Sequence, residues 1–595
     1  MGNTANTPRT NLTEMNDGNG DTTMSTHNDA VGFFIPTGSR RGLIKIQMIL
    51  SATGLRYGHK LKFLSKCNCN PMVVVYKKTS ADTLKEIGRT EVRMNSRDPV
   101  WINNIFSFHQ YYAPAIKLVF HVYHVDNDDL DLPGNMLKLN EQNFIGEASC
   151  VQLDIVTGQG RCLKLPLRKA QGDTEIRGTL SIHVEETVAA KQVVEMELCC
   201  SKVEHKGFMS KSDNFLRINR FKEGVDIAIH ETEVVMNDPN PTWKPIRLTT
   251  QRFQSKASIP FFFSFSFLYL SLLHARDTPL VIECFDFNGS GSHVTIGKLY
   301  TSITELKTLY HSKAGRNFCA PSPRKDQPKE LEAQLFVNNY VEKPLHSFSD
   351  YIKSGSELGF IVAVDFAASN GDPCLPTSLH HTDPSQKLNA YQQAISKVGR
   401  VIESSEFDPH ILTWGFAGVP VGNVVSDCFD LNRSANETEV KGSKSILSAY
   451  SHALQTISPG GPAARFGKII TKASELGRDQ TKYYVLVIIT AGVLDDIQES
   501  IDALVGASHC PLSIVIVGLG DAGFKDMEIL DADNGIPLKS STGQVAARDI
   551  VQFVPWCKLQ GGGQISVVEE LFDELPGQFL TYMRSKNIEP LTKTK

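Results

Sequence analysis

Long apolar runs mark the carboxyl-terminal half of the chain as an α/β domain. Residues 358–364 are apolar apart from one glycine, and the run stops at Asp365, after which small and polar residues follow. A strand buried on both faces needs such a run, because crossover helices cover both sides of a parallel sheet. Three further runs of this kind follow, at residues 411–416, 484–490 and 512–518. Helix-like segments at 443–457 and 497–508 lie between them. This alternation predicts a doubly wound (Rossmann-like) α/β fold, with ligand sites at the carboxyl ends of its strands.

A different pattern fills the amino-terminal half, where apolar and polar residues alternate over short runs. Residues 44–48, 116–122 and 180–184 show this alternation. It places one side of each strand in a core and the other side in solvent. Several such strands with turn residues between them predict a β-sandwich. A second set of short strands is expected over residues 194–341, so two all-β domains should precede the α/β domain.

Composition narrows the class of protein. The 595 residues include 61 basic and 65 acidic side chains, so the chain lacks the strong positive field of a nucleic-acid-binding protein. The 12 cysteines form no Cys-x-x-Cys pair, which argues against a zinc module and favours reduced thiols in a cytosolic protein. Residues 1–39 are mostly polar and have no secretory signal, so we expect a disordered tail there.

Specific segments carry a family resemblance. VAVDFAASNGDP, SLHH, YYVLVIITAGV, LSIVIVGLG and RDIVQFVPW occur in this order. Together they resemble the von Willebrand factor A-like domain of copines over residues 347–588. In the all-β half, SKSDNFL, ETEVVMNDPNPTWKP and VIECFDFNGSG resemble the second of the paired C2 domains of copines, and NSRDPVW resembles part of the first.

The resemblance implies an order of domains and a function. The expected order is a polar tail (1–39), a first C2 domain (40–187), a second C2 domain (188–341), the A-like domain (342–588) and a short tail (589–595). The family implies calcium-dependent phospholipid binding by the C2 pair and capture of protein partners by the A-like domain. It also implies a cytoplasmic protein that associates peripherally with the plasma membrane and modulates receptors, channels or signalling.

The first C2 domain has lost part of the calcium site that the resemblance implies. Calcium takes about six to eight oxygen ligands, so several carboxylates are needed. Asn70 and His124 stand at two aspartate positions of the family, and Asn143 stands near the last acidic position. Asp126 is retained, and Asp128 in the same acidic string is a candidate substitute. We expect calcium binding that is weak or absent.

The second C2 domain is similarly reduced. Asp213 and Asp286 match the aspartates of the family and remain candidate calcium ligands. Gly207, Asn288 and Val294 occupy the other ligand positions. Two carboxylates do not supply the charge that micromolar calcium binding requires, so the same expectation holds for this domain.

Basic residues beside apolar ones replace the acidic loops. The candidate docking residues are Lys60, Lys62, Phe63 and Lys66 in the first domain and Lys206, Phe208 and Lys211 in the second. Fixed cations attract an anionic membrane surface by about 1 kcal/mol per basic residue. The sequence therefore predicts docking on anionic phospholipid with little calcium, although solvated loop lysines with no membrane role remain an alternative.

One apolar segment, at residues 258–273, does not fit the C2 pattern. Its apolar part, 259–273, is about 15 residues long, short of the ~20 that a membrane-spanning helix needs. Three interpretations stay open: retained non-coding sequence in a gene model, a loop that dips into a membrane, or an extra packed element.

The A-like domain has also lost most of its expected metal ligands. The family site uses an Asp-x-Ser/Thr-x-Ser loop, a threonine and a second aspartate. Asp365 and Ser369 match the first loop, but Ala367, Ala463 and Ala491 replace the other three ligands. Magnesium demands near-octahedral oxygen coordination, so a magnesium site is not expected. Asp365 is expected to serve as a structural or loop-capping group.

An enzyme is not expected. No nucleophile, base and orienting group occur in a recognisable pattern, and His380 and His381 are expected to be an exposed loop pair. The favoured hypothesis is an adaptor that brings protein partners to membranes. The alternative is a degenerate family member that acts only as a protein-interaction scaffold, without metal or lipid binding.

Overall fold

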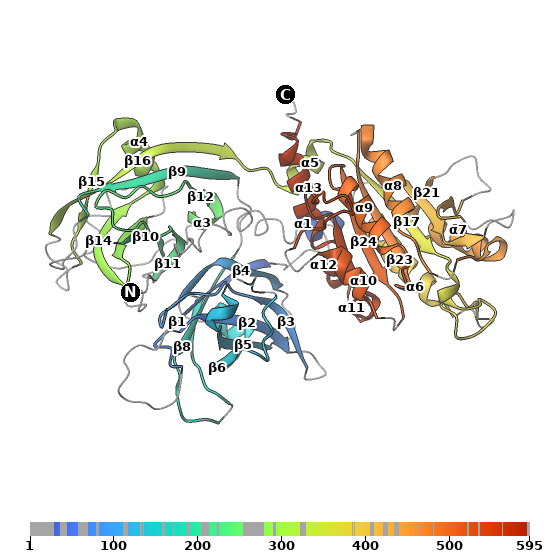
Figure 1. Ribbon diagram of the computed structural model, residues 1–595, viewed down its shortest axis with the longest axis horizontal. Coiled ribbons are helices and arrows are strands. Elements are labelled where there is room, and N and C mark those ends of the chain that lie inside the picture. The colour runs from blue at the N-terminus through green and yellow to red at the C-terminus, as the bar shows by residue number, and fades with distance from the viewer. Residues whose placement is uncertain are drawn as a thin grey trace, which may run out of the picture. The chain divides into compact units, whose positions relative to one another are not determined.

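The chain is organised as two compact units. The computed structural model describes residues 29–35, 44–57, 69–78, 83–110, 117–130, 132, 134, 136–157, 161–170, 172–186, 191–203, 213–222, 225–253, 279–288, 293–321, 329–383, 385, 387–404, 410–419, 426–432, 439–461, 463–479, 481–520, 523–532, 536–561 and 563–591. Unit 1 comprises Met1–Met24 and Gly42–Leu345, and unit 2 comprises Ser25–Arg41 and His346–Lys595. Figure 1 labels the helices and strands of both units.

The first part of unit 1 is an antiparallel β-sandwich. One sheet has the order β4-β1-β8-β7, from Val100–Gln110, Ile44–Thr53, Thr179–Glu186 and Cys162–Pro166. The other has the order β3-β2-β5-β6, from Leu84–Arg89, Pro71–Lys78, Lys117–His124 and Asn143–Val151. The short helix α2 is Gln152–Thr157. Met48, Trp101, Phe120 and Ile182 meet between the sheets, as the alternating pattern predicts.

The second part of unit 1 is also antiparallel and all-β. Its strands follow the order β11-β10-β13-β14-β15-β16-β9-β12. Their bounds are Gln192–Ser201 (β9), Asn214–Lys222 (β10), Val225–Glu231 (β11), Ile246–Thr249 (β12), Leu280–Asp286 (β13), Val294–Thr301 (β14), Arg316–Cys319 (β15) and Glu330–Pro344 (β16), with helices α3 (Thr250–Phe253) and α4 (Ile303–Ser312). Leu198, Leu216, Trp243 and Ile282 lie in its core.

Unit 2 is built on a mostly parallel sheet of order β20-β18-β17-β23-β24-β25. The parallel strands are β17 (Leu358–Asp365), β18 (His410–Phe416), β23 (Tyr483–Thr490), β24 (Leu512–Gly518) and β25 (Val551–Pro555), and the short strands β20 (Phe429–Asp430) and β21 (Glu439–Lys441) pair antiparallel with β18. Each predicted apolar run forms one of the parallel strands. The doubly wound fold is therefore confirmed.

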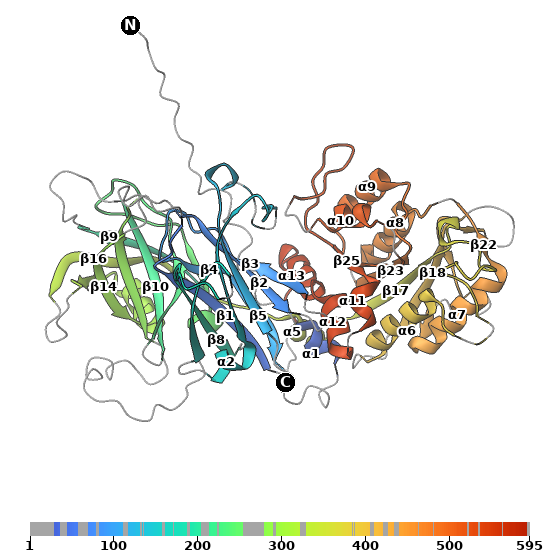
Figure 2. The same ribbon diagram turned by 90° about the horizontal axis from the view of Figure 1, so that it is seen from below.

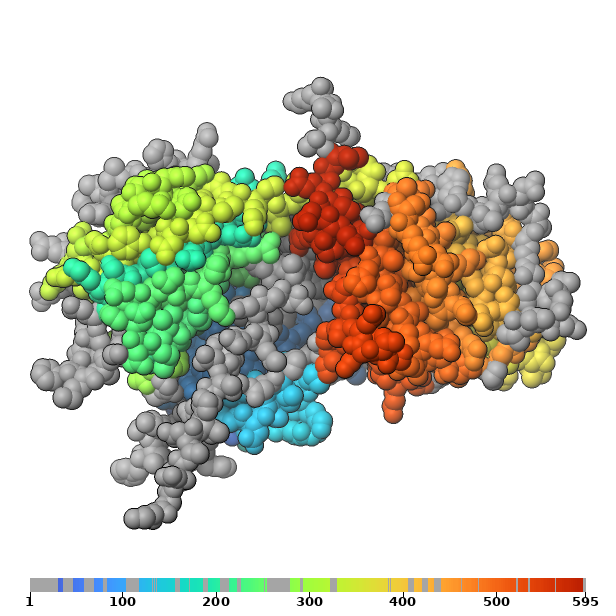
Figure 3. Space-filling view, turned by 45° about the horizontal axis from the view of Figure 1, so that its top comes forward, coloured from blue at the N-terminus to red at the C-terminus, as the bar shows by residue number. Residues whose placement is uncertain are grey.

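Helices cover both faces of this sheet. They are α5 (Phe348–Ser354), α6 (Ala390–Glu403), α7 (Gly442–Thr456), α8 (Gly467–Leu476), α9 (Ile497–Ala507), α10 (Lys525–Asp531), α11 (Trp556–Gln560), α12 (Gln564–Phe572) and α13 (Leu575–Ser585). Figure 2 shows α8, α9 and α10 on one side of the sheet and α6, α7 and α12 on the other. Figure 3 shows the last helices, in red, at the surface of unit 2. This two-sided cover explains why β17 is apolar along its whole length.

The expectation of a disordered tail over residues 1–39 is wrong for one segment. Asp29–Phe34 forms helix α1, and Phe34 and Ile35 are fully buried within unit 2. The polar residues around this segment predict a tail, whereas its apolar side chains pack on a surface formed by residues far along the chain.

The unusual apolar segment at 258–273 lies outside the described residues, so its three interpretations stay open. Within the described part of the chain, no helix is both long enough and apolar enough to cross a bilayer.

Candidate functional site

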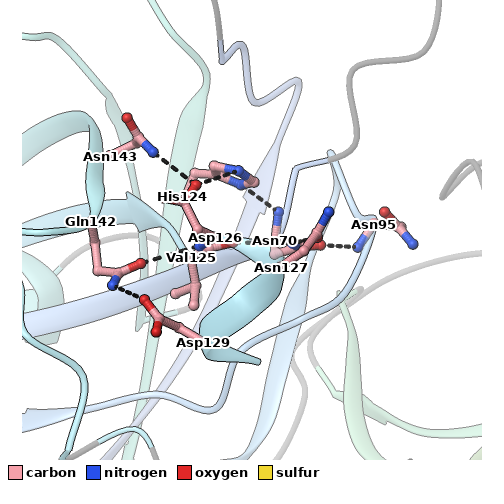
Figure 4. Close-up of polar contacts among 9 residues, drawn as sticks. All are labelled: Asn70, Asn95, His124, Val125, Asp126, Asn127, Asp129, Gln142 and Asn143. Atoms are coloured by element: carbon pink, nitrogen blue, oxygen red, sulfur yellow. Dashed lines mark hydrogen bonds and ion pairs between the residues drawn. The ribbon is translucent and has the colours of Figure 1, made fainter. Parts of the chain in front are cut away.

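One end of the first sandwich brings the substituted calcium positions together. In the β2–β5 pairing Pro71 faces His124, and in the β5–β6 pairing His124 faces Asn143. This register aligns the residue before β2, Asn70, with the end of β5 and the start of β6. The short 3-10 helix Asn127–Asp129 follows directly after β5. Three strand ends therefore place the polar side chains of Figure 4 in one cluster.

Asn70 is the centre of this cluster, and its side chain is 1% exposed. Its Nδ2 donates to the carbonyl oxygen of Val125 at 3.1 Å and to Oδ1 of Asn127 at 3.0 Å. Its Oδ1 accepts a hydrogen bond from the backbone N–H of Asn95 at 2.9 Å. An amide supplies both the donor and the acceptor that this arrangement needs. An aspartate supplies only acceptors.

His124 fills the second aspartate position as a neutral ring. The backbone N–H of Asn70 donates to its Nδ1 at 3.0 Å, so the ring proton is on Nε2, which lies 3.7 Å from Oδ1 of Asp126. The ring packs on Tyr57 with centroids 4.1 Å apart. Burial lowers the pKa of His124, which keeps the ring uncharged at neutral pH.

The retained carboxylates are already hydrogen-bonded to side-chain amides. Asn143 Nδ2 donates to Oδ1 of Asp126 at 2.9 Å, and Gln142 Nε2 donates to Oδ2 of Asp129 at 2.6 Å. Asp128, the predicted substitute ligand, is exposed on the 3-10 helix. Calcium requires oxygen atoms aimed at one point, whereas two amide nitrogen donors occupy the carboxylates here. The described residues at this end do not fit a calcium ion.

The second sandwich keeps two carboxylates side by side. Asp213 precedes β10 and Asp286 ends β13, and the backbone N–H of Asp213 donates to Oδ1 of Asp286 at 3.3 Å. Oδ1 of Asp213 accepts from the backbone N–H of Asn237 at 2.9 Å. Across the described residues of the whole chain, no group of three or more His, Cys, Asp or Glu side chains could hold a metal ion. Among its described residues, the second sandwich therefore brings Asp213 and Asp286 together as a pair and not as part of a larger group of metal ligands.

The predicted membrane-docking residues cannot be placed. Lys60, Lys62, Phe63, Lys66, Lys206, Phe208 and Lys211 all lie outside the described residues. Their role stays a prediction from the sequence.

In unit 2, Asp365 ends β17 and is fully buried. Its Oδ1 accepts from the backbone N–H of Ala367 at 2.8 Å. Its Oδ2 accepts from Thr490 Oγ1 at 2.8 Å and from the backbone N–H of Ala491 at 3.4 Å. Burial raises the pKa of Asp365, and these hydrogen bonds counteract part of that shift. Ser369, the other matching position, is exposed.

The surroundings of Asp365 do not fit a magnesium ion. Both carboxylate oxygens are engaged by protein donors, and the buried methyl groups of Ala367, Ala463 and Ala491 stand where oxygen ligands are needed. The carboxylate instead ties the end of β17 to the end of β23. This geometry is that of a structural group that links two loops.

His380 corrects the expectation of an exposed histidine pair. Its ring is 2% exposed and is stacked between Phe366 and Tyr391, with centroid distances of 5.2 Å and 4.2 Å. Nε2 lies 2.9 Å from the backbone oxygen of Asp365, and Nδ1 lies 2.8 Å from the hydroxyl of Tyr450. The loop sequence alone gave no signal of this burial, because Tyr391 and Tyr450 come from α6 and α7.

Comparison with known proteins covers nearly the whole chain. A model of the copine family matches residues 378–591, and a model of the C2 domain matches residues 46–167 and 191–318. Protein BONZAI 2 of Arabidopsis thaliana is 42% identical over 591 residues, which cover 97% of this chain and 96% of that protein. Protein BONZAI 1 of the same plant is 44% identical over 576 residues, covering 95% and 94%.

A solved structure named BON1-C2B is 35% identical to part of the chain. The matched region covers 26% of this chain and 93% of the solved structure, with a TM-score of 0.22. Two C2 domains precede the copine domain along the chain, and the alignments to the two BONZAI proteins, at 42% and 44% identity, cover 97% and 95% of the chain. The chain therefore belongs to the copine family.

Proposed function

We propose that this chain is a non-enzymatic adaptor that attaches to anionic phospholipid surfaces with little or no calcium and holds protein partners on its A-like domain. The observation that supports this most strongly is the cluster around Asn70. The side-chain amides of Asn70 and Asn143 donate hydrogen bonds, and the His124 ring accepts one, where a calcium site needs carboxylate oxygens. Because the polar groups at this end of the sandwich already hydrogen-bond one another, they need no ion to become ordered.

Attraction to the membrane then comes from fixed charge. The loop between β1 and β2 carries Lys60, Lys62 and Lys66 beside Phe63, and the loop between β9 and β10 carries Lys206 and Lys211 beside Phe208. Lysines near an anionic leaflet each contribute about 1 kcal/mol, and an aromatic side chain can enter the headgroup region. Such binding places the protein peripherally on the cytoplasmic side of the plasma membrane.

Partner capture by the A-like domain is proposed to be independent of metal. The loops that follow β17 and β23 expose Leu375 and Val493. These loops lie at the carboxyl ends of neighbouring strands, the edge at which open α/β sheets bind their ligands. Apolar side chains at this edge fit a protein surface and provide no metal ligand.

Charge reversal tests the membrane part of this proposal. Lys60, Lys62 and Lys66 are each replaced by Glu, and binding to phosphatidylserine vesicles is measured by cosedimentation in the presence of chelator. Removing three attractive charges should weaken binding by about 3 kcal/mol, or roughly 100-fold, and reversing their sign should weaken it further.

A matched triple variant controls for the change in net charge. Lys77, Lys85 and Lys117 are exposed and lie at the far ends of β2, β3 and β5 in the same sandwich, about 20 Å of strand from Asn70. Their replacement by Glu should weaken binding much less, because salt screens charges beyond about 10 Å. Equal losses in the two triples, or no loss in either, would contradict docking through this loop.

A further inference from the structure

Helix α1 is too short to be stable by itself. It has six residues, and isolated helices below about 12–15 residues are marginal in water. Nevertheless Ala30, Val31, Phe33, Phe34 and Ile35 are all buried. The surface on which α1 packs must therefore supply its stability.

That surface is an aromatic site on unit 2. Phe34 stacks on Phe572 of α12 with centroids 4.4 Å apart and meets Phe360 of β17 edge-on at 6.1 Å. Phe33 meets Phe348 of α5 edge-on at 5.4 Å. Figures 1 and 2 both place α1 among α5, α12 and α13.

A directed hydrogen bond adds to these ring contacts. Ser404, the residue after α6, has its Oγ 2.7 Å from the backbone oxygen of Phe34 and 2.8 Å from that of Val401, so its one hydroxyl proton is shared between these two acceptors. The Phe34 carbonyl belongs to the last residue of α1, where a helix leaves its carbonyl groups without intrahelical partners. The receiving surface thus recognises both the side chain and the backbone of Phe34.

The contact between α1 and unit 2 affects how the two C2 domains are attached to the A-like domain. Residues 25–41 belong to unit 2, the chain then forms unit 1 over residues 42–345, and it returns to unit 2 at residue 346. While α1 is docked, the two C2 domains are attached to the A-like domain at both ends. If α1 is released, this attachment is lost and the chain connection at residue 345 is kept.

We propose that α1 is a reversible clasp that closes the chain into a loop containing both C2 domains. Docking within one chain has an effective concentration up to the millimolar range, so a small aromatic interface suffices to keep the loop closed. Because the interface is small, α1 opens without unfolding the A-like domain. The clasp controls how freely the C2 pair moves relative to the partner-binding domain.

Hydrogen exchange of the full chain, followed by mass spectrometry, tests the clasp. In the wild-type chain, amides of residues 29–35 should be protected but should exchange faster than those of β17. Phe34→Asp should speed their exchange about 10- to 100-fold, because a buried phenyl ring is lost. Exchange of β17 should stay unchanged, and small-angle scattering should show a larger radius of gyration.

Gly32→Ala shifts the same equilibrium in the opposite direction. Gly32 lies on the exposed side of α1, and an added Cβ meets no atom within 4 Å. Alanine favours a helix over glycine, so exchange of residues 29–35 should slow about 5-fold. Three outcomes would overturn the clasp: unprotected residues 29–35 in the wild type, exchange of these residues only together with β17, or an unchanged radius of gyration when α1 is exposed.

Discussion

Replacing Asn70 by aspartate lowers the stability of the first C2 domain by about 3 kcal/mol in calcium-free buffer. The amide Nδ2 of Asn70 donates to Val125 and Asn127, and a carboxylate would face both acceptors without a proton. The position is buried, so water cannot take over these bonds. The change restores the aspartate of the family and yet damages the structure.

Calcium should reverse part of this loss in the variant. An aspartate at position 70 would add a second carboxylate near Asp126 and raise the affinity of the loop end for a cation. A ligand that binds only the folded state stabilises it in proportion to the logarithm of its concentration. Millimolar calcium should therefore stabilise Asn70→Asp more than the wild-type chain. Hydrogen exchange of β2 and β5 in the full chain measures both effects.

Asn127→Asp is the matched control. It adds the same charge to the same end of the sandwich, but its carboxylate still accepts the hydrogen bond from Asn70 Nδ2. We expect a loss of less than about 1 kcal/mol. Equal destabilisation by the two variants would mean that charge, and not the direction of the hydrogen bonds, decides the stability of this loop.

Acidification should destabilise the A-like domain through His380. Burial lowers the pKa of this histidine from 6.5 to about 4, because the ring is enclosed between Phe366 and Tyr391. The unfolded chain takes up the proton first, so the stability present above pH 6.5 is lost as the pH falls toward 4. Over this window the loss amounts to about 3 kcal/mol.

His380→Phe should remove this dependence while keeping the ring stack. The variant loses the contacts to Tyr450 and Asp365, so it is less stable at pH 7, but its stability should change less between pH 6.5 and 4. Asp365 contributes with the opposite sign, because burial raises its pKa and favours its protonated form as the pH falls. It is present in both chains, so the difference between them isolates His380. Hydrogen exchange of β17, corrected for intrinsic rates, gives the slopes, and identical slopes would contradict this assignment.

The parallel strands of the A-like domain could be predicted because each buried strand corresponds to a continuous run of apolar residues in the sequence. Residues 358–364 are apolar since helices cover both faces of β17, and this run is visible in the sequence as the pattern of a buried strand. The loss of metal ligands was also visible, as Asn70, Ala367 and Ala491 occupy ligand positions. The hydrogen bonds that form at these positions in place of metal coordination could not be predicted, because the direction of each bond depends on the folded backbone.

Contacts between distant segments escaped prediction for the same reason. Helix α1 is a short apolar segment in a long polar stretch, and its burial depends on Phe360 and Phe572, more than 300 residues away. The sequence predicts an exposed His380, because no local pattern indicates that Tyr391 and Tyr450 pack against its ring. The local sequence pattern indicates the periodicity of strands and helices and the positions of turns. The burial of α1 and of His380 depends on tertiary packing alone.

Cosedimentation of the full chain with phosphatidylserine vesicles, in calcium and in chelator, tests whether the C2 domains bind the membrane without calcium. We expect equal bound fractions in the two conditions and weaker binding as salt is raised, because fixed lysines and not bridging ions make the contact. Absence of binding in both conditions would leave only partner capture by the A-like domain. Binding that requires calcium would contradict the account, since the loop ends would then have to assemble a cation site from groups that already hydrogen-bond one another.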